Sequence, residues 1–203
     1  MKDWCRPGFV PASLAIAIVV SACAGPPPEL YVLGDAARPK PEHVSQLDDP
    51  IVEVKPVRVP DYLDTTDIFR REPGGRIVAS QSGRWGERLS VGVTRAVATS
   101  LEARLPQLVV TTSPPLERPR WEVLIDLDAF EVQPGGLSVL AARWSIREGR
   151  GGQKLREERI SLSAPIDRGS DQEVVETMTR QVDQLAGRIA SALQTVSLAE
   201  ATR

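Results

Sequence analysis

Near the middle of the chain the sequence reads Trp121-Glu122-Val123-Leu124-Ile125-Asp126-Leu127-Asp128-Ala129, in which apolar and polar residues largely alternate. Because successive side chains of a strand point to opposite faces, this pattern predicts a strand over about 119–132. Pro134-Gly135-Gly136 predicts a turn, and two further β runs follow at 137–148 and 155–164. Together the three runs predict an antiparallel meander with one polar face, as in a sheet that is covered on one side only.

Two stretches around this meander have the period of a helix instead. Apolar residues recur every three or four positions over about 86–104, and the pattern stops before Pro106. A longer stripe follows over about 171–198, where Asp171 is the expected cap and Glu173 lies near the positive end of the helix dipole. Such a stripe is usually a core face, although a helix that packs on a partner or on lipid shows the same pattern.

Shorter β signals precede the first helix. Residues 30–33 predict a first strand, and 51–59 predict a half-buried strand in which Pro56 marks a sheet edge or a bulge. Residues 67–71 and 76–80 flank Pro73-Gly74-Gly75, which predicts a hairpin. Another short strand is expected at 108–111, and the Pro-rich stretch between 34 and 50 is expected to be a loop.

The N-terminus has the pattern of an export signal. Lys2 and Arg6 precede an apolar run at 12–20, which is shorter than the roughly 20 apolar residues that span a bilayer. The run ends in Val20-Ser21-Ala22-Cys23, which looks like a bacterial lipobox, so we expect lipid on Cys23. An ordinary secretory signal with an incidental cysteine is the alternative.

These signals divide the chain into four parts. We expect a lipoprotein signal peptide at 1–22 and a lipidated cysteine with a Pro-rich tether at 23–29. A single domain is expected at 30–199, followed by a C-terminal tail at 200–203. No later stretch of the sequence is apolar and long enough to span a membrane, so we expect an anchored rather than a spanning protein.

Composition narrows the function. The 203 residues carry a net charge of −2 and are 41% hydrophobic and 26% charged, which fits a globular protein without the basic footprint of a nucleic-acid binder. Of the two cysteines, Cys5 leaves with the signal and Cys23 would carry lipid. The domain is therefore expected to contain no disulfide and no thiolate metal site.

The sequence also contains no convincing catalytic constellation. His43, the single histidine, lies in the Pro-rich loop with nothing to position it beside a serine. Asp61, Asp64 and Asp67 are spaced for acid–base chemistry or calcium, but in a turn such residues more often bond their own backbone. The glycine turns lack the spacing of a phosphate loop. We expect neither enzymatic activity, nor a metal, nor a cofactor.

A family resemblance centres on Val59-Pro60-Asp61-Tyr62-Leu63-Asp64. This stretch is similar to the Val-Pro-Asp-Tyr-Leu signature of the PqiC (YmbA)-type lipoproteins, the ABC-type transport auxiliary lipoprotein component family. Tyr31-Val32-Leu33 after the lipobox, Ile77-Val78-Ala79-Ser80 in the hairpin, and Arg84-Trp85-Gly86-Glu87-Arg88-Leu89 at the helix start extend the similarity. It is sharpest over 57–106, whereas past residue 120 it rests on the order of the elements.

The resemblance implies a fold and a role. The expected fold class is α/β, with a mixed, largely antiparallel sheet and two main amphipathic helices packed on one face. The implied role is that of a docking component beside an MCE-domain (MlaD-like) transport system that moves phospholipids or other lipids between the inner and outer membranes. By the family's sorting logic Ala24 favours anchoring at the periplasmic face of the outer membrane, and a homo-oligomer is a further implied partner.

The candidate contact residues are Asp61, Tyr62, Leu63 and Trp85. Apolar residues displayed in a loop are what a partner surface would use. The alternative is that Tyr62 and Leu63 fold back over the end of the sheet, and that Trp85 belongs to the core. Two other functions also stay open. One is a lipoprotein that itself shields an acyl chain in an apolar cavity, and the other is a general envelope-integrity lipoprotein.

Overall fold

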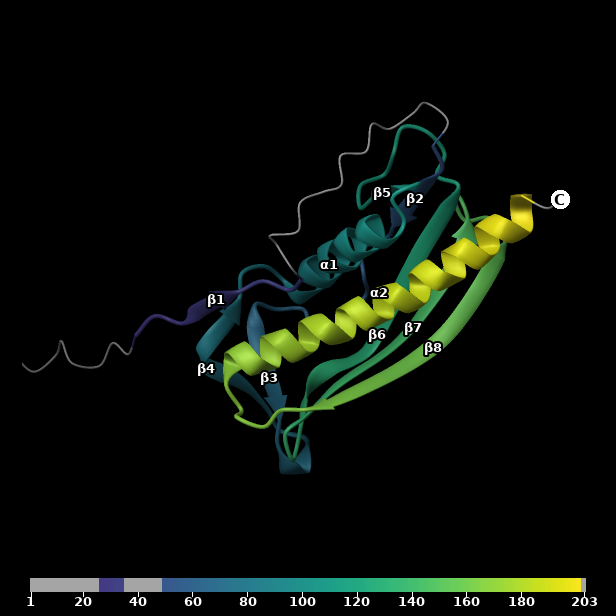
Figure 1. Ribbon diagram of the computed structural model, residues 1–203. Coiled ribbons are helices and arrows are strands. Elements are labelled where there is room, and N and C mark those ends of the chain that lie inside the picture. Colours follow the sequence, from purple (N-terminus) through teal and green to yellow (C-terminus); the bar gives the residue numbers. More distant parts are fainter. Residues whose placement is uncertain (1–25, 35–48, 202–203) are drawn as a thin grey trace, which may run out of the picture.

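The computed structural model describes residues 26–34 and 49–201 of the chain (Figure 1). The predicted signal peptide, Cys23 and His43 lie outside the described residues. Within them the chain forms a mixed sheet of eight strands with two helices, α1 and α2, on one face. The predicted α/β fold is therefore confirmed.

The meander forms as predicted and is the longest part of the sheet. β6 (Trp121–Gln133) pairs antiparallel with β7 (Leu137–Glu148), which pairs antiparallel with β8 (Lys154–Pro165). Side chains alternate between the helix-covered face and the opposite face, so the residues of β8 are alternately exposed and half-buried along much of its length. The helix-covered face holds the largest buried side chains of the meander, which are Trp121, Phe130 and Trp144.

The other edge of β6 carries strands that the sequence predicted, but their parallel pairing was not predicted. β2 (Ile51–Val54) lies parallel to the start of β6, with Val52 opposite Trp121, and β5 (Val109–Thr111) lies parallel to β2 on its far side. β3 (Asp67–Arg71) touches the end of β6, where Arg70 pairs with Val132. β6 thus has neighbours on both sides and forms the centre of the sheet.

The expected hairpin extends the sheet toward the N-terminus. β3 pairs antiparallel with β4 (Ile77–Trp85) through a short 3-10 turn at Pro73–Gly75. β1 (Glu29–Tyr31) then lies parallel to β4 at the end of the sheet and is held by three residue pairs. The exposed residues Pro26 to Pro28 lead into it, so the described end of the tether joins the sheet at Glu29.

The prediction for 51–59 is only partly right. The bulge at Pro56 is confirmed, because Val54 lies opposite Val123 and Arg58 opposite Asp126, so the chain after β2 has one extra residue there. The edge alternative and the half-buried character are wrong, since β2 lies between β5 and β6 and its residues from Val52 to Val54 are buried. Pro56 interrupts the ladder because it has no N–H to donate. Pairing with β6 resumes at Arg58, whose N–H donates to the carbonyl of Ile125 at 3.0 Å.

Both helices form where the periodicity predicts them. α1 (Leu89–Arg104) and α2 (Asp171–Ala201) lie side by side over the sheet. The apolar stripe of α2 is a core face, since Val174, Met178, Val182, Leu185, Ile189 and Leu193 are all buried. α2 ends at Ala201, three residues past the predicted helix end at 198 and inside the predicted C-terminal tail at 200–203. None of the described helices combines the length and the apolarity that crossing a membrane requires.

The predicted cap of α2 is corrected by one residue. The hydroxyl of Ser170, rather than the carboxylate of Asp171, accepts the N–H of Glu173 at 3.3 Å. The Glu173 carboxylate reaches back to accept three backbone N–H groups, those of residues 167, 168 and 169. Because the cap is already supplied, the side chain of Asp171 is free to point into the sheet.

Candidate functional site

The stretch Pro60–Asp64, here called the signature turn, is a hydrogen-bonded turn between β2 and β3. The N–H of Leu63 donates to the carbonyl of Pro60 at 2.8 Å, and the N–H of Asp64 donates to the carbonyl of Asp61 at 3.3 Å. This geometry buries Leu63, which is 1% exposed, and leaves Asp61 and Tyr62 at the surface.

Tyr62 is exposed but held in place. Its side chain is 39% exposed, and the Arg71 guanidinium carbon lies 5.8 Å from the ring centroid. Its hydroxyl accepts from Arg71 at 3.1 Å and donates to Glu131 at 3.4 Å. Burial and the Glu131 carboxylate raise the pKa of Tyr62, so the hydroxyl remains a donor at neutral pH. The ring is therefore displayed in a defined orientation.

The anchor of this arrangement is the buried carboxylate of Glu131 on β6. It accepts from Arg71 Nε at 2.5 Å and Nη2 at 3.0 Å, and from the amide of Gln133 at 2.7 Å. A forked Arg–carboxylate contact of this kind fixes both partners. We call Tyr62, Arg71 and Glu131 the tyrosine clamp.

Two candidate contact residues are placed in the core instead of at the surface. Leu63 joins the hydrophobic core, and Trp85 at the end of β4 is only 4% exposed. Neither offers the exposed surface that a partner contact needs, because both side chains are buried. Asp64 and Asp67 are structural as well. Asp64 accepts the N–H of Ser90 at 3.0 Å, and Asp67 pairs with Arg84 at 2.9 Å.

A second polar cluster joins the N-terminus of α2 to the β3–β4 hairpin. The buried carboxylate of Asp171 accepts from the hydroxyls of Ser80 and Ser82 at 2.6 and 2.7 Å, and Arg70 lies 3.3 Å away. Gly83 permits this approach, because a Cβ there would lie 2.7 Å from the Asp171 carboxylate oxygen. Burial alone would raise the pKa of Asp171, but the hydrogen bonds from Ser80, Ser82 and Arg70 outweigh it and lower the pKa.

We expect Asp171→Asn to lower the free energy of unfolding at pH 7 by about 1.5–3 kcal/mol, the usual worth of a hydrogen bond to a charged group. A carboxyl with a depressed pKa stabilises the fold above its unfolded pKa of about 3.9, and that stabilisation is lost as the pH falls through the folded value. The difference in the free energy of unfolding between wild type and variant should therefore disappear below about pH 4. Urea unfolding at a series of pH values measures it, with the exposed Asp128→Asn as control, and a gap that is independent of pH would contradict this role.

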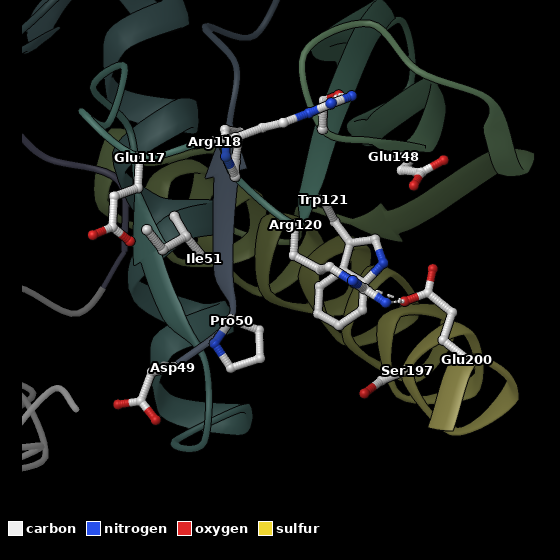
Figure 2. Close-up of a pocket in the computed structure, with 12 residues that line it drawn as sticks. Asp49, Pro50, Ile51, Glu117, Arg118, Arg120, Trp121, Glu148, Ser197 and Glu200 are labelled. Carbon is white, nitrogen blue, oxygen red and sulfur yellow. Dashed lines mark hydrogen bonds and ion pairs between the residues drawn. The ribbon is translucent and has the colours of Figure 1, made fainter. Parts of the chain in front are cut away.

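The third feature is a surface cleft at the opposite end of α2, shown in Figure 2. This distal cleft has a volume of about 660 Å³. It is lined by the start of β2, the loop before β6, the end of β7 and the last turns of α2: Asp49, Pro50, Ile51, Glu117, Arg118, Pro119, Arg120, Trp121, Glu148, Gly149, Ser197 and Glu200.

Close backbone packing builds one wall of the distal cleft. A Cβ on Gly149 would lie 1.7 Å from the carbonyl oxygen of Pro119, so only glycine lets the β7–β8 turn meet the loop before β6 there. Arg118 donates to the carbonyl of Gly149 at 2.9 Å, and Arg120 forms an ion pair with Glu200 at 2.6 Å. Sequence reasoning missed this cleft because its residues come from four separate segments, none of which forms a motif.

Among the described residues no group of three or more histidine, cysteine, aspartate or glutamate side chains is placed to hold a metal ion. The buried carboxylates of Glu131 and Asp171 belong to two separate clusters. The first accepts hydrogen bonds from arginine, tyrosine and glutamine, and the second accepts them from serine and arginine. Both carboxylates therefore hold separate elements of the fold together.

The fold has solved counterparts. A crystal structure of an uncharacterized protein has a TM-score of 0.67 and 19% identity, covering 81% of this chain and 97% of the other. A Xanthomonas campestris protein has a TM-score of 0.60 and 14% identity, with 84% and 97% of the two chains covered. At these identities the likeness shows the fold alone.

No curated protein matches the chain, but one family model does. The family model for the ABC-type transport auxiliary lipoprotein component matches residues 31–190, which extends from β1 through most of α2 and includes the tyrosine clamp. On that match, the chain belongs to the family of ABC-type transport auxiliary lipoprotein components.

Proposed function

We propose that this protein is the docking component of an MCE-type ABC lipid transport system, anchored by Cys23 to the periplasmic face of the outer membrane. Family membership supports the transport role. The observation that carries the docking role is the tyrosine clamp, because Arg71 and Glu131 hold an exposed aromatic ring in one orientation. An ordered surface tyrosine costs little entropy on binding, which is why tyrosine is enriched at interaction hot spots.

The described structure argues against the alternative of a lipid carrier. Its buried apolar side chains form one core cluster between the sheet and the helices. The hollow between α1 and α2, of about 420 Å³, exposes apolar surface but also has the charged side chains of Arg95, Arg180 and Asp183 in its lining. An acyl chain bound there would take these charges out of water, which costs free energy even where they are paired.

Crosslinking tests the docking role directly. A photoreactive residue at position 62 in intact cells should capture an MCE-domain subunit or a second copy of this chain, whereas the same residue at the exposed Val91 of α1 should capture much less. Capture of phospholipid alone at position 62 would favour the carrier. No product at position 62 in a membrane-bound protein would overturn the proposed contact.

Tyr62→Ala should weaken copurification of the captured partner about tenfold or more, equivalent to about 1.4 kcal/mol. Tyr62→Phe should retain most of the binding, because the ring stays below the Arg71 guanidinium. Both variants should change the free energy of unfolding by no more than about 1.5 kcal/mol, the worth of one hydrogen bond, since Tyr62 is partly exposed. Equal binding by wild type and Tyr62→Ala would exclude the ring from the interface.

The anchor requires a separate test. Cys23→Ala should abolish labelling by radioactive palmitate and release the protein from the membrane fraction, because the lipid contributes about 0.8 kcal/mol for each buried methylene group. Labelling that persists in this variant would show that the lipid, if present, is attached elsewhere. Fractionation of inner and outer membranes then decides which membrane holds the wild-type protein.

A further inference from the structure

The distal cleft lies far from the end of the domain where the tether enters. α2 begins beside the tether, where Asp171 lines the same surface hollow as Pro26 and Pro27, and it ends at the cleft with Ser197 and Glu200. At 1.5 Å per residue along α2, Asp171 is separated from Ser197 and Glu200 by about 40 Å. Figure 1 shows β1 and the C-terminal end of α2 on opposite sides of the molecule. A protein held by its N-terminus therefore presents the cleft away from the membrane.

The cleft carries an excess of negative charge. Four carboxylates line it, those of Asp49, Glu117, Glu148 and Glu200, against the two guanidinium groups of Arg118 and Arg120. Arg120 is paired with Glu200, whereas the exposed Glu117 and Glu148 make no ion pair within the described part of the chain. Complementary charge across an interface sets specificity and the rate of encounter, so a cationic ligand is favoured.

An unsatisfied donor lies at the inner side of the cleft. The side chain of Trp121 lines the cleft and is 2% exposed, and its indole N–H has no hydrogen-bond partner among the described residues. Figure 2 shows the indole nitrogen at the ring edge that faces the side of Glu148 and Glu200. A buried N–H without a partner is costly, so a ligand that offers an acceptor there gains free energy.

Two exposed leucines are next in sequence to residues that line the cleft. Leu116 is fully exposed and precedes the lining residue Glu117, and the largely exposed Leu198 follows the lining residue Ser197. An extended peptide supplies all the groups that this surface asks for. Its backbone carbonyls accept hydrogen bonds, its lysine or arginine side chains can pair with Glu117 and Glu148, and its aliphatic side chains cover leucine.

We propose that the distal cleft binds an extended segment of the transporter partner that is rich in basic and aliphatic residues. A backbone carbonyl of that segment accepts the Trp121 indole N–H, and its cationic side chains pair with Glu117 and Glu148. In the Arg120–Glu200 pair the arginine is about half exposed, so the pair contributes little stability and can rearrange to admit the carbonyl. The proposal rests on the proposed function, because that function supplies the partner.

The indole resonances provide a direct test. The full lipoprotein, labelled with ¹⁵N-tryptophan in nonionic detergent micelles, is titrated with acetyl-Gly-Lys-Leu-Lys-Gly-amide and with its glutamate analogue acetyl-Gly-Glu-Leu-Glu-Gly-amide. The basic peptide should shift the Trp121 indole N–H, assigned from Trp121→Phe, and leave that of Trp144 in place. Trp144 is a matched internal control, because its indole N–H is also buried without a partner but does not line the cleft.

The variant Glu117→Gln/Glu148→Gln should weaken basic-peptide binding at least tenfold, and Asp128→Asn should leave it unchanged. Unchanged Trp85 and Trp144 resonances show that each variant is folded. An unmoved Trp121 signal, equal binding of the two peptides, or full affinity in the double glutamine variant would overturn the proposal. None of these results bears on the crosslink at position 62, which tests the proposed function independently.

Discussion

Trp144→Ala should lower the free energy of unfolding by about 3–5 kcal/mol, the range observed when a buried aromatic side chain is truncated. Trp144 is fully buried in the middle of β7, opposite Ile125 of β6 and Glu158 of β8. Its loss opens a cavity where the meander meets the helix layer, and close-packed interiors collapse only partly around such a space. Urea unfolding followed by far-ultraviolet circular dichroism measures the change.

Leu116→Ala is the matched control for this loss. It also removes a large apolar side chain, but Leu116 is fully exposed, so the free energy of unfolding should change by less than about 0.5 kcal/mol. If Trp144→Ala were as mild as Leu116→Ala, the meander and the helices would not share the single core described here.

Arg71→Ala should cost about 3 kcal/mol, at the lower end of the range for breaking a buried ion pair. Glu131 is almost completely buried, so removing Arg71 leaves a carboxylate without its main partner. Arg71 itself retains contact with water, which is why the lower end applies. The same variant releases the ring of Tyr62, so partner binding should weaken together with stability.

Two further variants separate charge from geometry in the tyrosine clamp. Arg71→Lys keeps the positive charge but cannot make the forked contact, and it should recover only part of the loss. Arg71→Leu combined with Glu131→Leu removes both charges and should restore most of the stability, because an apolar pair of similar volume replaces a buried ion pair at little cost. Partner binding should remain weak in this double variant. Recovery of binding would show that the clamp does not orient Tyr62 for docking.

The local elements of the fold were predictable because their signals are local. The meander from Trp121 onward shows period two, and the two helices show apolar spacings of three and four. The parallel pairings of β1, β2, β3 and β5 were not predictable, because they join segments far apart in sequence and leave no periodic trace. Pro56 indicated the bulge correctly, but a missing N–H does not show whether the strand is at an edge or in the centre of the sheet.

The candidate site was likewise predictable only where its signal is local in the sequence. The signature turn was found from its residues, but its sequence does not show which apolar side chains fold inward, and Leu63 and Trp85 do so. Asp171 looks like a cap by position, yet Ser170 takes that role and leaves the carboxylate to bind the hairpin. The partners of Tyr62 come from β3 and β6, so only the folded chain brings Arg71 and Glu131 to it.

The short strand β1 determines how the domain responds to mechanical load. A pull on the N-terminal segment enters the sheet at Glu29, where only three residue pairs to β4 resist it. The meander shares far longer ladders and lies several strands away, so the applied force should detach β1 first and leave the rest folded. Detachment would lengthen the connection to the membrane, so we expect β1 to separate from the sheet at a lower force than the one that unfolds the core.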